Sequence, residues 1–407
     1  MRSDWEPEYR RIAAALMRDA PAAGTVVAGF NVCVDHVYRL TDVDLARLRR
    51  TLDSPALKPL ERRLLDTLLG RIGSGHDAEL LAHVAPAWLE SNDVLGHPNT
   101  RQIGGTAAQV AWSLAVLGAP TVIALTDRSD GILETLPAGI GVCQAGSAKV
   151  TPHITAQPVS GKPPHYVLEY SRGTWWERGA LPRSGHVVLR TCNDGIEQDQ
   201  QFADLSAVGV NAAAGVLSGL AGVPAGDTVS WVWVRTVAGA WRDSGVPIVH
   251  LELGDYCHLP LLAVAVNFSG VVTSLGASLA ELRRLGANDQ DPVAFARDLA
   301  EGLELSRVLV HADHWSMSVH RGDRSRERDM VLAGNLVAAS RARTGTPTPV
   351  LSVHSHSTFT DDRPASRALG GGWYVECVPT PHLARPRTTV GLGDSFVAGS
   401  ILASLIT

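Results

Sequence analysis

Thr388-Thr-Val-Gly-Leu-Gly-Asp-Ser-Phe-Val-Ala-Gly-Ser400 is the stretch from which the fold can be worked out. Two glycines separated by one residue allow a tight backbone turn. The apolar residues that follow recur at helical spacing, so Gly391–Asp394 is predicted to begin a helix. Unpaired N–H groups at a helix start suit a phosphate, and Asp394 beside them is placed to accept a proton from an attacking hydroxyl. The alternative is a glycine turn in which Asp394 is an ordinary N-cap.

The composition indicates a globular α/β protein. Of the 407 residues, 45% are hydrophobic and 19% are charged, which is typical of a chain with a core and no disordered tail. Strand and helix patterns alternate, so the chain forms either about two or three domains or one large α/β unit that carries an insertion. The formal net charge of −5 provides no basic surface, so nucleic acid is not expected as a partner.

The cysteines and the apolar segments bear on the cellular location. The 5 cysteines are widely spaced and form no Cys-x-x-Cys pair, which argues against a disulfide framework or a structural zinc site. The charged N-terminus lacks an apolar signal core, and no apolar run reaches the roughly 18 residues of a membrane span. We therefore expect a soluble, cytoplasmic protein without a membrane partner. The sequence leaves the oligomeric state open.

Polar and small residues stand where the predicted strands meet loops. Residues 25–35 are predicted to form one buried strand with Asn31 and Asp35 at its end, and an open parallel sheet binds ligands beyond the carboxyl ends of its strands. A capped turn after an edge strand is the alternative. Gly104 and Gly105 open a helix of small residues, where the backbone can approach a ligand closely.

The remaining patterns predict one main parallel sheet. Its further strands are expected at 121–126, 215–219, 248–253, 270–274 and 307–312. Helices are expected at 8–19, at 40–70 and in a segment that ends at Trp88.

Between residues 150 and 192 the pattern changes to strict alternation, as in 165–170 and 186–190. Such half-buried antiparallel strands indicate a smaller, separate sheet, which we interpret as a lid. Trp175 and Trp176 on this lid either stack on a ligand or pack internally. The segment 341–387 is expected to contain loops and short strands.

Four motifs, in this order along the chain, resemble the ADP-dependent glucokinase and phosphofructokinase family of the ribokinase-like superfamily. Gly29-Phe-Asn-Val-Cys-Val-Asp35 resembles the family's Gly-Phe-Asn-x-x-x-Asp, and Gly104-Gly105 resembles its glycine pair. His250-Leu-Glu252 resembles its His-x-Glu, and Gly391-Leu-Gly-Asp394 resembles its Gly-x-Gly-Asp. Ordinary ribokinases share the glycine pair and the terminal motif, whereas His-x-Glu and a chain of this length are typical of the ADP-using branch.

The resemblance implies a ribokinase-like α/β fold, with a doubly wound, mainly parallel sheet flanked by helices and a smaller β-rich lid. Residues 1–37, 102–149 and 193–407 would form the large nucleotide-binding domain, and residues 38–101 and 150–192 would cover the acceptor. The implied enzyme is a phosphotransferase that moves the β-phosphoryl group of ADP to a sugar hydroxyl, with Mg²⁺ as cofactor.

The resemblance also assigns roles to the terminal motif. Asp394 would be the base that receives the hydroxyl proton. The backbone N–H groups of Gly391, Leu392 and Gly393 would stabilise negative charge on the transferring phosphoryl group.

Two further motifs would hold the metal. Glu252 would bind Mg²⁺ through water, with His250 orienting it. The superfamily's Asn-x-x-Glu reads Ser278-Leu-Ala-Glu281 here. Glu281 is retained, whereas the shorter hydroxyl of Ser278 replaces an amide, a change that would alter or weaken metal binding.

The acceptor side of the resemblance involves Asn31, Asp35, Glu79 and the backbone of Gly104 and Gly105. These match positions that hold sugar hydroxyls in the family, and carboxylate and amide groups suit a polyhydroxylated ligand because each buried hydroxyl needs a partner. Glu79 favours a neutral sugar, since a carboxylate would repel a sugar phosphate.

Other functions stay open on the sequence alone. The family's glutamine after the glycine pair is Thr106 here, which leaves the identity of the acceptor open. One alternative is an ATP- or GTP-dependent small-molecule or nucleoside kinase of the same fold. Another is a catalytically weak nucleotide- or sugar-binding pseudokinase, which Ser278 permits and the retained Asp394 and Glu252 disfavour.

Overall fold

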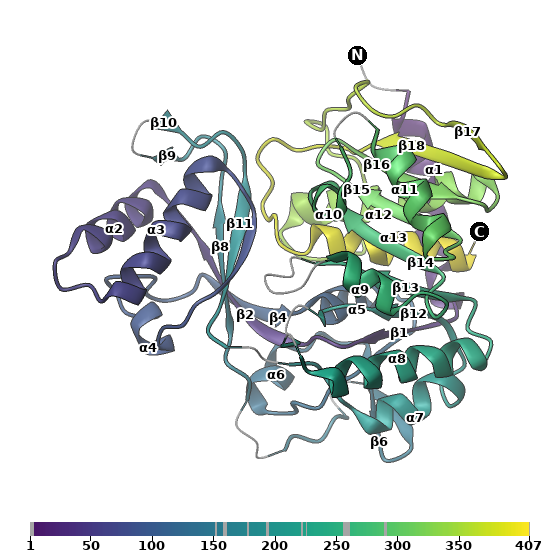
Figure 1. The fold of residues 1–407 in the computed structure, drawn as a ribbon, viewed down its shortest axis with the longest axis horizontal. Helices are drawn as coiled ribbons and strands as arrows, with labels where there is room; N and C mark the ends of the chain where they lie inside the picture. The colour runs from purple at the N-terminus through teal and green to yellow at the C-terminus, as the bar shows by residue number, and fades with distance from the viewer. Residues whose placement is uncertain are drawn as a thin grey trace.

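The computed structural model contains one large sheet and one small sheet, each covered by its own helices (Figure 1). It describes residues 4–150, 153–157, 161–176, 179–192, 195–220, 223–224, 226–254, 261–288 and 291–406. None of the helices in these ranges is long and apolar enough to cross a membrane.

The large sheet has 11 strands with a parallel block at its centre. In spatial order the strands are β17 (Arg367–Gly370), β18 (Trp373–Pro379), β16 (Trp315–His320), β15 (Arg307–His311), β14 (Ser274–Ser278), β13 (Ile248–Glu252), β12 (Ala212–Leu217), β1 (Thr25–Gly29), β5 (Thr121–Ile123), β6 (Ile140–Gln144) and β7 (Ser147–Val150). All pairs from β15 to β6 are parallel, and the strands outside this block pair antiparallel. The carboxyl ends of the parallel strands therefore meet at one edge, where this class of sheet places its ligands.

Helices cover both faces of the large sheet. One hydrophobic cluster includes residues of α7 (Gln200–Val208), α8 (Thr228–Asp243), α9 (Leu261–Asn267), α10 (Leu279–Leu285) and α11 (Pro292–Gly302). The other includes residues of α1 (Glu6–Asp19), α5 (Thr106–Val116), α6 (Asp130–Thr135), α12 (Arg324–Thr344) and α13 (Leu392–Ile406), and a short 3-10 helix (Ala20–Ala22) follows α1. Within β1, Val27 joins the first cluster and Val26 and Ala28 join the second, because successive strand side chains point to opposite faces. The predicted doubly wound α/β class is confirmed.

A smaller unit lies at the left of Figure 1 and has a hydrophobic core of its own. Its five-stranded sheet has the order β3 (Ala78–Leu81), β11 (Gly185–Arg190), β8 (His165–Tyr170), β2 (Cys33–Arg39) and β4 (Thr100–Gly104). Its other elements are α2 (Asp42–Asp53), α3 (Pro59–Ser74), α4 (Pro86–Leu89) and a hairpin of β9 (Trp175–Trp176) and β10 (Gly179–Ala180). β8 and β11 pair antiparallel, as the alternating pattern predicts. We call these elements the smaller unit; β2 and β4 cross the predicted boundaries after residues 37 and 101.

The prediction of a single strand over residues 25–35 is wrong. β1 ends at Gly29 and pairs with β12 and β5 of the large sheet, whereas β2 begins at Cys33 and pairs with β4 and β8 of the smaller one. Residues on both sides of the break are buried, so the apolar pattern continues through the point where the chain changes sheets. Asn31 therefore lies on the connection between the two sheets.

Other differences from the predicted elements occur at prolines and glycines. The helix predicted over 40–70 is two helices, because α2 ends at Asp53 and Pro59 occupies the first turn of α3, where proline fits well. The helix predicted before Trp88 is the short α4, preceded by β3. The strand predicted at 270–274 begins only at Ser274, after Gly270 with its φ of +74°.

Candidate active site

The turn before α13 requires glycine at position 391. Gly391 has a φ of +69°, and a Cβ atom there would overlap the guanidinium group of Arg341. α13 starts at Leu392, as the sequence predicts, so the N–H groups of Leu392 and Gly393 have no acceptor within the helix. A helix N-terminus beside a buried cation is a favourable place for an anion.

Asp394 lies in the first turn of α13 and is partly buried. Burial raises the pKa of Asp394 to about 7, although the charge of Arg341 and a hydrogen bond with the Thr106 side chain act in the opposite direction. A carboxyl group with a pKa near neutrality can accept a proton and release it again. Thr106, the first residue of α5, therefore contacts the candidate base.

Arg341 is a buried cation that the sequence analysis did not identify. It lies on α12 with only 1% of its surface exposed, and its Nη1 atom is 3.4 Å from Ser395 Oγ. Among the described residues, its Nε and Nη2 atoms have no hydrogen-bond partner. Burial lowers the pKa of Arg341 to about 10, so the group remains charged at neutral pH. A buried guanidinium with unused donors is an incomplete site that an anionic ligand would complete.

Glu252, at the end of β13, is held by two histidines. His250 Nε2 is 3.0 Å from Glu252 Oε2, and His311 Nε2 is 3.2 Å from Glu252 Oε1. Burial alone would raise the pKa of Glu252, but these two hydrogen bonds hold it below its ordinary value. His250 Nδ1 is also 2.8 Å from Ser274 Oγ, so the imidazole is oriented from both sides.

His311, the last residue of β15, links Glu252 to the turn before α13. Although burial disfavours its charged form, the hydrogen bond to Glu252 holds the pKa of His311 above its ordinary value. A Cβ atom on Gly393 would lie 3.0 Å from His311 Cε1, so the imidazole packs directly against this turn. His311 falls within a predicted strand and stands at its carboxyl end, which is the one sequence signal that could have identified it.

Ser278 and Glu281 form a capping box at the start of α10. Ser278 Oγ accepts a hydrogen bond from Glu281 N at 3.1 Å, and Glu281 Oε2 accepts one from Ser278 N at 2.6 Å. Burial raises the pKa of Glu281, the charge of His311 lowers it, and the charge of Glu252 raises it. These three groups are therefore electrostatic neighbours, and the hydroxyl of Ser278 caps the helix in place of an amide.

Four of the predicted acceptor residues lie close together: Asn31 on the connection between the two sheets, Asp35 on β2, and Gly104 and Gly105 at the end of β4. A Cβ atom on Gly104 would overlap the carboxylate of Asp35, and a Cβ atom on Gly105 would lie 2.5 Å from the carbonyl oxygen of Asn31. Asn31 is buried, and its side-chain Oδ1 has no hydrogen-bond donor within the described part of the chain. An amide oxygen in this state suits a ligand hydroxyl.

Cys33 and His165 border Asp35, and the sequence analysis did not single them out. His165 stands opposite Asp35 in the pairing of β2 with β8. Cys33 Sγ is 3.3 Å from His165 Nδ1 and 3.5 Å from Asp35 Oδ1. Burial raises the pKa of Asp35, and the charge of His165 opposes this shift. The acceptor side therefore has a polar cluster supplied by two strands of the smaller unit.

Glu79 is the predicted acceptor residue that lies apart from the others. It belongs to β3, which β11 and β8 separate from β2 and Asp35. Its Oε1 atom is 2.5 Å from Nε of the buried Arg190 on β11. Glu79 thus lies on the same small sheet as Asp35, but on the edge strand β3 and in an ion pair with Arg190.

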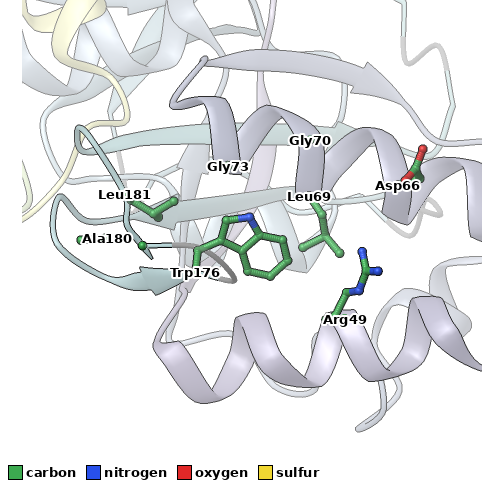
Figure 2. A pocket seen from close by; sticks show the side chains of 9 residues that line it. Arg49, Asp66, Leu69, Gly70, Gly73, Trp176, Ala180 and Leu181 are labelled. Atoms are coloured by element: carbon green, nitrogen blue, oxygen red, sulfur yellow. The ribbon is translucent and has the colours of Figure 1, made fainter.

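A cavity of about 500 Å³ lies elsewhere on the smaller unit, between α2, α3 and the β9–β10 hairpin (Figure 2). Its described lining contains none of the predicted site residues. Trp176 reaches across to Gly73, where an added Cβ atom would lie 2.7 Å from the indole Nε1. Trp175 is 62% exposed, and its backbone N–H donates to Asp42 at 2.7 Å. Trp176 therefore packs against the core of the smaller unit and also lines this cavity.

Comparisons with known proteins show which kinds of protein this chain resembles. Searches against family models find no match. The chain is 22% identical over 451 aligned positions to the ADP-dependent glucose/glucosamine kinase of Pyrococcus furiosus, and the alignment covers 98% of both chains.

Solved structures agree with this result. An ADP-dependent kinase in complex with fructose-6-phosphate and ADPβS superimposes with a TM-score of 0.77 at 16% identity, covering 100% of this chain and 98% of the other. The last common ancestor of ADP-dependent phosphofructokinases from Methanosarcinales gives a TM-score of 0.69 at 17% identity, with coverage of 99% and 98%. These findings confirm the predicted resemblance to ADP-dependent sugar kinases and the ribokinase-like fold.

Proposed function

We propose that this protein is an ADP-dependent sugar kinase that transfers the β-phosphoryl group of ADP to a hydroxyl of a neutral sugar. The observation that carries the proposal is the buried Arg341, whose Nε and Nη2 donors lack partners in the described chain while Gly391 packs against its guanidinium group. The full-length similarity to the Pyrococcus furiosus kinase supports ADP as donor and a sugar as acceptor.

Asp394 is the proposed general base. With its pKa raised to about 7 by burial, it is deprotonated in a large fraction of molecules at neutral pH and can receive the proton of the attacking hydroxyl. The N–H groups of Leu392 and Gly393 and the guanidinium group of Arg341 would stabilise the charge that spreads over the transferring phosphoryl oxygens.

The acidic groups near this turn fit Mg²⁺. The negative charge of the buried Glu252 acts on the partly buried Glu281, so a cation is favoured between them, and carboxylate oxygens with ordered water are the ligands that Mg²⁺ prefers. We propose that Glu252 and Glu281 would hold the ion through water, and that it would neutralise phosphate charge when bound. His250 and His311 keep Glu252 ionised and oriented for this purpose.

The acceptor would bind beside Asn31, Asp35 and the Gly104–Gly105 backbone. The orphaned Oδ1 of Asn31 supports a ligand that donates hydrogen bonds, as a sugar hydroxyl does. The carboxyl group of Asp35 in this region would disfavour an acceptor that already carries a phosphate, and we propose that Glu79, farther along the same small sheet, acts in the same direction. We propose that residues 38–101 and 150–192 act as the lid over this acceptor, and that the enzyme works in the cytoplasm.

The test is thermal stabilisation by ADP, ATP, GTP and AMP with Mg²⁺, followed by a turnover assay that detects AMP and sugar phosphate. A ligand that binds only the folded state raises the melting temperature according to its affinity. A selective shift with ADP, and AMP formation that depends on a neutral sugar, would support the proposal. Turnover with ATP or GTP alone would favour the nucleoside or small-molecule kinase, and the absence of any shift would favour a pseudokinase.

A further inference from the structure

Glu169 is a buried carboxylate of the smaller unit that none of the roles above uses. It lies on β8 and is only 6% exposed. Its Oε1 atom accepts hydrogen bonds from Thr388 Oγ1 at 2.6 Å, from Thr389 N at 2.7 Å and from Val390 N at 3.3 Å. The Thr389 hydroxyl is a longer contact at 3.4 Å. One carboxylate oxygen of Glu169 thus accepts hydrogen bonds from a loop that lies more than 200 residues away in sequence.

These donors belong to the three residues that directly precede the Gly391 turn. The side chain of Val390 packs with Val37 and Val167 on the smaller sheet, and His186 Nδ1 lies 3.1 Å from Thr389 Oγ1. The loop is therefore docked on the smaller unit by an apolar contact and by hydrogen bonds to a carboxylate, while α13 that follows packs in the core of the large unit.

The negative charge of Glu169 faces an arginine from each of the two units. Arg39, a neighbour on β2, places its Nε 3.8 Å from Glu169 Oε2. Arg341 on α12 interacts with the charges of Glu169, Asp394 and Asp35. Because Arg341 also packs against Gly391, the position of the loop relative to Glu169 affects the cation beside the candidate anion site.

We propose that Glu169 is a positioning residue that sets the conformation of the loop 388–393, so that the N–H groups of Leu392 and Gly393 point at the transferring phosphoryl group only when the smaller unit is docked. Docking over the acceptor and assembly of the anion site are then one event. This coupling would keep the site incomplete, and ADP protected from water, until the acceptor is covered. The inference rests on the proposed kinase function for its kinetic consequence, but its structural part can be tested separately.

The structural test is amide hydrogen exchange of the peptide that spans residues 385–395. In the wild type the N–H groups of Thr389 and Val390 are bonded to a buried carboxylate, and hydrogen bonds to charged groups are the strong ones. In Glu169→Ala we expect exchange of this peptide to accelerate about 10- to 100-fold while the later turns of α13 keep their protection. Glu169→Gln should restore part of the protection, because its amide oxygen still accepts.

Glu90→Ala is the matched control. Glu90 is also a carboxylate of the smaller unit and accepts a hydrogen bond from Tyr166 at 3.0 Å, but within the described residues it forms no hydrogen bond or ion pair with the loop 388–393. Exchange at 385–395 should match the wild type in this variant. Unchanged exchange of the loop in Glu169→Ala, or equal acceleration in Glu90→Ala, would overturn the inference.

The kinetic test compares kcat with KM. Misplacing a reacting group by about 1 Å costs on the order of 10²-fold in rate, so we expect kcat of Glu169→Ala to fall by about that factor, with KM for ADP changed less than about threefold. Thr388→Val removes the 2.6 Å donor from the loop side and covers the case in which Glu169→Ala does not fold. The losses of Thr388→Val and Glu169→Gln should be less than additive in the double variant.

The outcomes separate this inference from the proposed function. If the wild type shows no ADP-dependent turnover, the proposed function fails, and the exchange experiment still decides whether Glu169 orders the loop. If the wild type turns over and Glu169→Ala has the same kcat, or the double variant is strictly additive, the positioning role is refuted while the kinase assignment stands.

Discussion

The partly buried Asp394 and the buried Glu252 influence each other's charge, yet their pKa values move in opposite directions. Burial raises the pKa of Asp394 to about 7, whereas hydrogen bonds from His250 and His311 hold the pKa of Glu252 below its ordinary value. The same low-polarity setting therefore yields one group that can exchange a proton near pH 7 and one that stays ionised. The difference comes from the number of hydrogen-bond donors, and it supports the proposed roles of Asp394 in proton transfer and of Glu252 in holding negative charge.

The largest expected effect is the loss of turnover in Asp394→Asn, which removes the proposed base and leaves the shape of the side chain. General base catalysis contributes roughly 10²- to 10⁴-fold, so kcat should fall by about 10³-fold. The melting-temperature shift with ADP should stay within a few degrees of the wild type. Retained turnover in Asp394→Asn would sink the assignment of the base.

Glu252→Gln tests the other half of the comparison. The amide cannot carry the charge that His250 and His311 stabilise, and it is a weaker ligand for Mg²⁺. We expect kcat to fall about 10²-fold and the Mg²⁺ concentration for half-maximal activity to rise, because charge stabilisation in a buried site is lost. A Mg²⁺ titration of the rate at saturating ADP measures both changes; an unchanged titration curve would remove Glu252 from the metal site.

The pH dependence of kcat/KM should report the raised pKa of Asp394. Activity should rise about tenfold per pH unit below pH 7 and level off above it, because only the carboxylate form accepts a proton. Glu252 should not contribute in this range, since its pKa is lowered. Measurements should extend about two pH units below the pKa of Asp394, where the expected fall in activity is clear. A profile that is flat between about pH 5 and pH 8 would contradict the role of Asp394.

Stability provides an independent check of the same group. Because the folded-state pKa of Asp394 lies above its unfolded value of 3.8, the folded protein binds more protons between these two values. Its contribution to the free energy of unfolding is present below the unfolded pKa and is lost as the pH rises towards about 7. Asp394→Asn should therefore show a smaller loss of stability than the wild type over this range, as measured by urea unfolding at several pH values.

Glu79→Ala should have the smallest effect. Glu79 lies across the small sheet from Asp35 and pairs with Arg190, so its loss should raise KM for the sugar only about three- to tenfold, in the range of one ordinary hydrogen bond. KM for ADP should stay the same within error. Equal increases in both values would show that Glu79 does not contact the acceptor.

The terminal motif and its helix could be predicted from the sequence because their signals are local. The glycines at 391 and 393 and the apolar spacing after them lie within one short stretch, and the structure begins α13 at Leu392. The glycine pair at 104 and 105 also lies against Asp35 and Asn31, although Asp35 belongs to the smaller sheet and not to the end of a strand of the large one. These are features of backbone geometry and strand order.

The residues that the sequence analysis missed depend on long-range contacts. Arg341 lies in an arginine-rich last turn of α12, which looks like a solvent-exposed helix end, and its burial results from packing against Gly391 and Trp112. His311 and Glu169 stand on apolar strands, where a polar residue gives no sign of its partner. The change of sheets after Gly29 is hidden for the same reason, because both strands are buried.

By itself, therefore, the sequence determined the α/β class, the glycine turn before the last helix and the identity of Asp394 and Glu252 as candidate groups, since glycine turns and periodic apolar patterns act through neighbouring residues. Only the tertiary structure decided the charge state of these groups and the partners of Arg341, His311 and Glu169. The pKa of a carboxyl group depends on how much water and how many donors surround it, and here those surroundings come from strands and helices far apart in the chain.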